Sequence, residues 1–146
     1  MFYGEFEHTL DRKGRLIIPS KFREALKEHY IERFFITRGL DKCLFMFTED
    51  EWKLQEQKFR SMPFTKSEYR RFNRLYFSGA GDLVPDKQGR ILIPGYLKEY
   101  AGIKRDVYII GVSNRIEIWS QENWKGYYSS SQGSFEEVAE KLIELE

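Results

Sequence analysis

The sequence has few of the residues from which enzymes build active sites. It contains one cysteine, Cys43, and two histidines, His8 and His29, which fall in different predicted elements. No Cys-x-x-Cys, His-Glu-x-x-His, Gly-x-Ser-x-Gly or phosphate-loop pattern occurs. Because the usual spacings of metal ligands and activated nucleophiles are missing, we expect no enzyme, no metal or other cofactor, and no small-molecule substrate.

Long hydrophobic runs and paired cysteines are missing as well. No stretch approaches the roughly 18 apolar residues that span a bilayer, so no membrane partner is expected. The opening Met-Phe-Tyr-Gly-Glu-Phe-Glu lacks the basic and apolar segments of a signal peptide. A single cysteine forms no internal disulfide, which agrees with a reducing compartment. These features predict a cytoplasmic protein.

Neither sign of charge dominates the chain. The 24 Lys and Arg residues against 23 Asp and Glu leave a net charge of +1. Any nucleic acid would therefore have to be attracted by local basic clusters. With 146 residues and 41% hydrophobic content, the chain suits one domain with a substantial core, or two small domains sharing it. The 12 Phe and 9 Tyr residues also lead us to expect apolar burial between subunits.

The sequence contains two copies of one motif. Residues 11–19 read Asp-Arg-Lys-Gly-Arg-Leu-Ile-Ile-Pro, and residues 86–94 read Asp-Lys-Gln-Gly-Arg-Ile-Leu-Ile-Pro. The correspondence continues beyond the motif, because residues 44–48 match 116–120. Two copies are too few for a solenoid. The sequence instead predicts a duplicated half-domain that closes on itself, as one barrel or sandwich with approximate two-fold symmetry.

Each repeat is predicted to run strand, turn, strand, helix, strand, turn, strand, helix. In the first repeat, alternation from Phe6 to Leu10 indicates a half-exposed strand. Residues 16–18 are uniformly apolar and predict a strand with no exposed face. Pro19 ends that strand, and Ser20 is placed to cap the following helix. The core side of this helix is predicted to carry Phe22 and Leu26, and the same spacing extends to Tyr30.

Three further helix starts are predicted from capping boxes, in which Ser or Thr precedes Glu by three residues. The pairs are Thr48 with Glu51, Thr65 with Glu68, and Ser134 with Glu137. Residues 126–133 are rich in serine and predict a flexible lead-in to the last helix. The predicted α+β chain thus divides into repeat 1 (5–47), a helical connector (48–76), repeat 2 (77–120) and a C-terminal helical tail (121–146).

One strand face differs between the repeats. The outward positions of the last strand in repeat 2 include Arg115 and Glu117, whereas those of repeat 1 are Cys43, Phe45 and Phe47. The apolar face must be covered, and either the connector helices or a neighbouring subunit could cover it.

The doubled turns gather basic side chains. Arg12, Lys13 and Arg15 cluster in one turn, and Lys87 and Arg90 in the other. A purely structural interpretation makes them hairpin turns in which Asp pairs with Arg. A functional interpretation gives Arg15 and Arg90 contacts with phosphates or guanine edges, and gives the other three residues sequence-independent phosphate contacts.

Four residues are predicted to shape these turns. Asp11 and Asp86 can accept hydrogen bonds from the backbone of their own turns and orient the arginine. Gly14 and Gly89 tolerate the positive φ that such a turn needs before the chain enters a strand.

With these motifs, the chain resembles the bacterial MraZ family over nearly its whole length. The resemblance rests on the two Asp-x-x-x-Arg motifs with their aliphatics and Pro, the opening Met-Phe-Tyr-Gly-Glu-Phe, and the Arg-Leu-Tyr-Phe-Ser-Gly-Ala of residues 74–80. It implies a double-split β-barrel of two tandem SpoVT/AbrB-like domains, with extra connecting and C-terminal helices.

The resemblance also implies a function and partners. These are a ring-shaped homo-oligomer and a nucleoid-associated transcriptional regulator, which binds direct repeats in double-stranded DNA upstream of an operon of division and cell-wall genes. Arg15 is the strongest candidate for DNA contact. The second turn carries Gln88 where the first has Lys13, so its equal share in binding is in question.

An alternative from another class is a protein-binding, antitoxin-like scaffold module of the same fold. The tail from residue 134 onward is acidic, so a protein is a better partner for it than nucleic acid.

Overall fold

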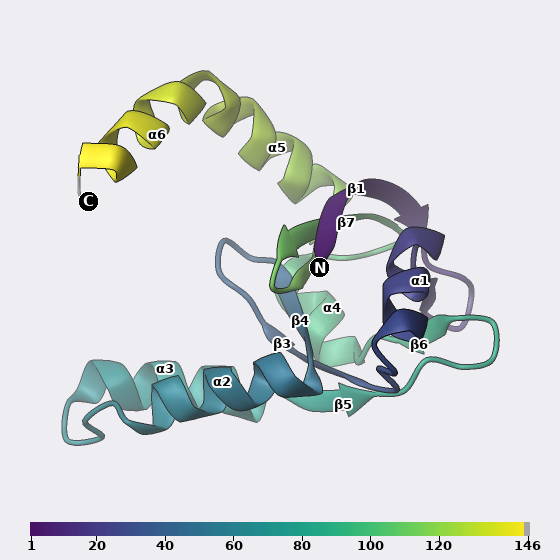
Figure 1. The fold of residues 1–146 in the computed structure, drawn as a ribbon, viewed down its shortest axis with the longest axis horizontal. Helices are drawn as coiled ribbons and strands as arrows, with labels where there is room; N and C mark the ends of the chain where they lie inside the picture. The colour runs from purple at the N-terminus through teal and green to yellow at the C-terminus, as the bar shows by residue number, and fades with distance from the viewer. Residues whose placement is uncertain (145–146) are drawn as a thin grey trace.

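The computed structural model describes residues 1–144 and has an α+β fold, as the sequence predicts (Figure 1). The strands are β1 (Phe2–Thr9), β2 (Arg15–Ile17), β3 (Phe34–Arg38), β4 (Leu44–Thr48), β5 (Gly81–Leu83), β6 (Arg90–Leu92), β7 (Asp106–Ser113) and β8 (Ile116–Ser120). The α-helices are α1 (Ser20–Glu28), α2 (Glu49–Arg60), α3 (Ser67–Ser78), α4 (Gly95–Ala101), α5 (Gln121–Ser131) and α6 (Phe135–Glu144), with a 3₁₀ turn η1 (Gln132–Ser134) before α6. Residues 145 and 146 of the predicted tail lie outside the described part.

The strands form two antiparallel layers that join the halves of the chain. The six-stranded sheet has the order β1-β7-β8-β4-β3-β5, and β2 pairs with β6 in a separate ribbon. Since β5, β7 and β8 are the second-half counterparts of β1, β3 and β4, this order is symmetric about its centre. Four of the pairings, β1 with β7, β2 with β6, β3 with β5 and β4 with β8, cross from one half to the other. The two halves therefore interlock.

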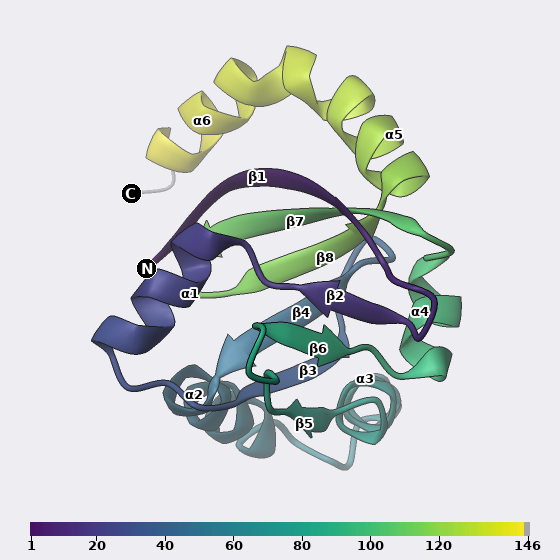
Figure 2. The same cartoon turned by 90° about the vertical axis from the view of Figure 1, so that its right-hand side faces the viewer.

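The main core lies between the ribbon and the six-stranded sheet (Figure 2). Leu16 and Ile91 point inward from the ribbon and are fully buried, among apolar side chains of the sheet and of α1 and α4. Successive side chains of a strand point to opposite faces, so Ile17 and Leu92, which follow Leu16 and Ile91, face outward and are exposed. The prediction that residues 16–18 have no exposed face is therefore wrong, because the ribbon is covered on one side only.

The predicted helix starts have mixed outcomes. Thr48 caps α2, accepting a hydrogen bond from the Glu51 N–H at 3.4 Å. Thr65 caps nothing, because α3 starts two residues later with Lys66 at its N-cap. Ser134 belongs to the 3₁₀ turn and donates to the Ser131 carbonyl. Residues 126–133, predicted to be a flexible lead-in, are helical.

The start and end of α1 also differ from prediction. Pro19 occupies the N-cap position, and Ser20 is the first helical residue and makes no capping hydrogen bond. Tyr30 lies beyond the helix with a φ of 55° and is exposed. A chain reversal after Glu28 thus takes Tyr30 off the apolar face formed by Phe22 and Leu26.

The chain itself covers the apolar face predicted on repeat 1. Cys43 and Phe47 are buried. Helices α2 and α3 pack on this side of the sheet through an aromatic cluster that includes Trp52 and Tyr76. The charged positions of repeat 2 lie on this same face, because Glu117 pairs with Phe45 across β8 and β4. Glu117 is buried there and accepts hydrogen bonds from Arg115 and Trp119.

Two helical arms extend from the body of the molecule. The pair α2–α3 and the pair α5–α6 project on the side away from the β2–β6 ribbon (Figure 1). The ribbon therefore presents its outer face at one side of the molecule, and the arms lie at the other.

None of the helices described within residues 1–144 combines the length and apolar character needed to cross a membrane.

Candidate nucleic-acid interface

The first doubled turn is organised by one carboxylate. Asp11 Oδ1 accepts hydrogen bonds from the backbone N–H groups of Lys13 and Arg15, both at 2.9 Å. The backbone closes the same loop, with Asp11 N–H donating to the Arg15 carbonyl and Gly14 N–H to the Asp11 carbonyl. Gly14 has a φ of 78°, which a residue with a Cβ adopts only with strain. Four hydrogen bonds thus close the turn at an exposed tip.

The second turn repeats this geometry. Asp86 Oδ1 accepts from the N–H groups of Gln88 and Arg90 at 2.9 Å, and Gly89 also has a φ of 78°. Because the third position contributes only its backbone N–H, the replacement of lysine by Gln88 leaves the shape of the turn unchanged. The two turns differ in charge and agree in conformation.

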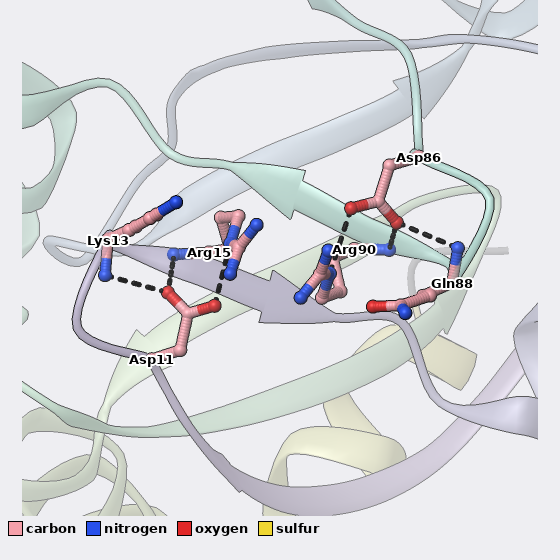
Figure 3. Close-up of polar contacts among 6 residues, drawn as sticks. All are labelled: Asp11, Lys13, Arg15, Asp86, Gln88 and Arg90. Atoms are coloured by element: carbon pink, nitrogen blue, oxygen red, sulfur yellow. Dashed lines mark hydrogen bonds and ion pairs between the residues drawn. The ribbon is translucent and has the colours of Figure 1, made fainter.

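The second oxygen of each carboxylate holds an arginine side chain. Arg15 Nε donates to Asp11 Oδ2 at 2.7 Å, and Arg90 Nε donates to Asp86 Oδ2 at 2.8 Å (Figure 3). The arginine side chains remain 30% and 28% exposed. Within residues 1–144 their terminal Nη groups have no protein hydrogen-bond partner. Each guanidinium is therefore oriented by its aspartate and still has four N–H donors to offer a ligand.

The same contacts keep the aspartates ionised. The backbone N–H of Arg15 is the largest cause lowering the pKa of Asp11 below its ordinary value, and the Arg15 side chain and the Lys13 N–H act in the same direction. The pKa of Asp86 is lowered for the same reasons by Arg90 and Gln88. At neutral pH both carboxylates are therefore charged, as orienting a guanidinium requires.

The ribbon brings the two arginines onto one surface. In its register Arg15 lies opposite Leu92, and Ile17 lies opposite Arg90. Arg15 and Arg90 are consequently diagonal neighbours on the outer face, a relation that places such residues roughly 7–8 Å apart. Figure 3 shows both side chains between the two aspartates. Strand pairing across the halves thus unites two motifs that lie 75 residues apart.

The remaining basic residues of the motifs occupy the tips. Arg12 and Lys13 lie exposed on the first turn and Lys87 on the second. Their side chains make no hydrogen bonds with other described residues. These side chains take no part in the hydrogen bonds that close the turns, so they are available to an anionic partner.

Two basic residues near the turns were missed by the sequence analysis. Arg23 of α1 lies beneath the second turn, next to Gly89, and its Nε donates to the Ile18 carbonyl at 3.0 Å. Lys98 of α4 lies beneath the first turn, with its Nζ 3.1 Å from where a Cβ on Gly14 would be. Positions 23 and 98 correspond in the repeat alignment, so a basic residue at both was the available signal.

Burial shifts the pKa of the cysteine and of one histidine. Cys43 is buried, and burial raises the pKa of its thiol, which keeps it protonated. Partial burial lowers the pKa of His8 on β1. The described residues hold no cluster of three or more His, Cys, Asp or Glu side chains suited to a metal ion.

The fold and this surface together define a class: an interlocked tandem-repeat α+β protein that displays two aspartate-held arginines on one exposed ribbon. The sequence profile of the family described as "MraZ protein, putative antitoxin-like" matches residues 1–75 and again residues 76–145. Over 145 residues the chain is 52% identical to a protein of Syntrophomonas wolfei subsp. wolfei named "Transcriptional regulator MraZ", covering 99% of both chains. The chain belongs to the MraZ family, which confirms the resemblance seen in the sequence.

Proposed function

We propose that the protein is a sequence-specific DNA-binding transcriptional regulator of the cytoplasm and nucleoid. It would bind direct repeats upstream of an operon of division and cell-wall genes. The observation that carries the proposal is the diagonal pair Arg15 and Arg90, each held outward by its own aspartate. The name of the Syntrophomonas relative supports the regulatory role.

A two-stranded ribbon is a suitable element for reading duplex DNA. The major groove is about 12 Å wide and admits such a ribbon, and arginine is the commonest reader of guanine, through its O6 and N7 acceptors. With Nε engaged by the aspartate, the Nη groups of Arg15 and Arg90 supply the donors. Arg12, Lys13 and Lys87 contact phosphates on either side, which adds affinity without base selection.

The proposal includes the finer architecture. The chain is taken as a double-split β-barrel of two tandem SpoVT/AbrB-like domains, residues 5–47 and 77–120. Residues 48–76 form its connector and residues 121–146 its tail. The symmetric sheet order and the cross-half pairings support this assignment.

The protein would act as a ring-shaped homo-oligomer. The α5–α6 arm carries a set of exposed apolar side chains: Tyr127, Tyr128, Phe135, Val138, Leu142 and Ile143. Helix α6 also carries several glutamates, whereas α3 carries Arg70, Arg71 and Arg74. A head-to-tail contact between the acidic arm of one copy and the basic arm of the next would close into a ring. Several ribbons meeting successive repeats would then gain about 10²–10⁴ in avidity, offsetting the small net charge.

The central test is a gel shift with the duplex upstream of the protein's own gene. Arg15→Ala should abolish or greatly weaken binding, because a bidentate guanine contact contributes ~1–3 kcal/mol per turn, compounded across the ring. Arg33→Ala, which removes an equal charge from an exposed residue between α1 and β3, outside the ribbon and both arms, is the matched control and should bind as the wild type does. Light scattering should show the same oligomer for all three proteins. Wild-type affinity in Arg15→Ala at moderate salt would refute the proposal.

A second candidate is a protein-binding, antitoxin-like module. The observation that favours it is the exposed apolar and acidic arm, together with the family description. In that case Arg15→Ala would leave the activity unchanged, and deletion of residues 130–146 would abolish it. The regulator hypothesis predicts that single-site DNA binding survives this deletion.

A further inference from the structure

The outer face of the ribbon carries two aliphatic side chains that neither the core nor the arginine contacts account for. Ile17 is 36% exposed and Leu92 is 58% exposed, whereas the alternate residues Leu16 and Ile91 are buried in the core. Ile17 and Leu92 occupy corresponding positions of the two motifs. The same exposed aliphatic therefore recurs at both copies of one site.

Each aliphatic side chain faces an arginine across the ribbon. Leu92 is opposite Arg15, and Ile17 is opposite Arg90. Leu92 Cδ1 also lies 3.9 Å from where a Cβ on Gly14 would be, so this side chain rests against the first turn. The outer face is thus a four-residue surface with two guanidiniums on one diagonal and two aliphatic groups on the other.

This composition matches two groups that bases present in the DNA major groove. Guanine presents two acceptors there, and thymine presents a C5 methyl group, the apolar feature of its edge. An aliphatic side chain beside a guanidinium can cover that methyl group while the guanidinium binds an adjacent guanine. Exposed strand positions need no aliphatic residue for folding, and a polar β-former would avoid the exposed apolar area.

We propose that Ile17 and Leu92 are specificity-determining residues that contact thymine methyl groups next to the bases bound by Arg15 and Arg90. The inference rests on the proposed function and adds a second base to what each arginine selects. The ribbon would then recognise a guanine together with a neighbouring thymine.

The test compares two versions of the same upstream duplex, amplified with dTTP or with dUTP. Deoxyuridine keeps every hydrogen-bonding group and removes the methyl group. The wild-type protein should bind the uracil duplex about fourfold more weakly for each contacted methyl group lost. The Ile17→Ala/Leu92→Ala protein should bind the thymine duplex more weakly than the wild type and show equal affinity for the two duplexes.

The matched control is Leu40→Ala, which truncates a similarly exposed leucine (61%) in the turn between β3 and β4, outside the ribbon and both arms. It should keep both the affinity and the preference for thymine. A titration with salt separates apolar from ionic contacts: the double variant should keep the wild-type slope of log Kd against log salt, whereas Lys13→Ala should lower it.

Two results would overturn the inference. One is a wild-type protein that binds both duplexes equally, a measurement that does not depend on how any variant folds. The other is a double variant that keeps the full thymine preference. In either case, loss of binding by Arg15→Ala would leave the proposed function standing. Wild-type binding by Arg15→Ala would instead remove the proposed function itself.

Discussion

At the residue scale, one aspartate in each turn does two things at once. Its Oδ1 fixes the turn through two backbone N–H groups, and its Oδ2 orients the arginine that faces outward. The structural and the functional interpretations of the motif therefore describe the same contacts. An ion pair within the turn is the means by which the free end of the guanidinium is presented.

Replacing Asp11 by Asn should separate these two roles. The Asn oxygen can still accept the backbone N–H groups, but its Nδ2 is a donor and cannot accept from Arg15 Nε. We expect the fold to remain and DNA affinity to fall about tenfold, because Arg15 loses the acceptor that orients its guanidinium before DNA binds. Anisotropy with the upstream duplex measures this effect.

Asp82→Asn is the control, because Asp82 is an exposed aspartate whose ion-pair partner is Arg33 and not a motif arginine. It should bind DNA normally. An Asp11→Asn protein with unchanged affinity would show that Arg15 binds DNA equally well without its hydrogen bond to Asp11.

The two turn glycines should differ in their tolerance of alanine. Both have a φ of 78°, so each substitution should destabilise by roughly 1–2 kcal/mol. At Gly89 the added Cβ would also overlap Arg23, disturbing its hydrogen bond to the Ile18 carbonyl. At Gly14 it meets the end of the flexible Lys98 side chain and, at ordinary contact distance, Leu92 Cδ1. Urea unfolding should therefore place Gly89→Ala about 1 kcal/mol below Gly14→Ala.

Gly126→Ala is the reference substitution, because a Cβ there meets nothing within 4 Å and the site lies inside α5. It should leave stability equal or raised. Equal losses at Gly14 and Gly89 would mean that Arg23 moves aside freely.

At the element scale, the helix caps show how far local sequence decides where a helix begins. Thr48 and Thr65 both precede Glu by three residues, yet only Thr48 caps a helix. Thr48 ends β4, which fixes its extended conformation, whereas Thr65 lies in the α2–α3 connection.

Alanine at these two positions should have unequal effects. Thr48→Ala should lower the free energy of unfolding by about 1 kcal/mol, the usual contribution of a Thr N-cap. Thr65→Ala should change it by less than about 0.5 kcal/mol, as at other exposed sites. Urea denaturation of both variants checks the pair. A similar loss for Thr65→Ala would contradict the observed start of α3 at Ser67.

At the scale of the whole molecule, the pairing between halves makes one cooperative unit. Strands β1, β2, β3 and β4 each pair with a strand of the second half. Neither half therefore has partners for all its strands within its own sequence. The core that joins ribbon and sheet likewise draws side chains from both halves.

Separate halves should not fold as monomers. We expect residues 1–75 or 76–146 alone to be unfolded, or to pair with a second copy of the same half in place of the missing one. Circular dichroism melting at several concentrations, with light scattering, distinguishes these states, and mixing the halves should restore the native spectrum. Cooperative melting of a monomeric half, independent of concentration, would contradict the interlocked fold.

The sequence by itself determined the features that depend on neighbouring residues. The turn chemistry of Asp11 to Arg15, the strand that alternates from Phe6 to Leu10, and the Thr48 cap follow from short-range hydrogen bonding and periodicity. Repetition of the motif also indicated the two-fold relation, and the resemblance to the family followed from motif order along the chain.

Only the tertiary structure decided which surfaces are covered. Residues 16–18 read as a buried strand, but Ile17 is exposed because no segment within residues 1–144 packs on the outer side of the ribbon. The strand face at Phe47 is buried because the connector folds back on it. Diagonal placement of Arg15 and Arg90 likewise depends on the cross-half register. Burial and register arise from contacts between distant segments, and a local pattern of residue types carries no information about which segments meet.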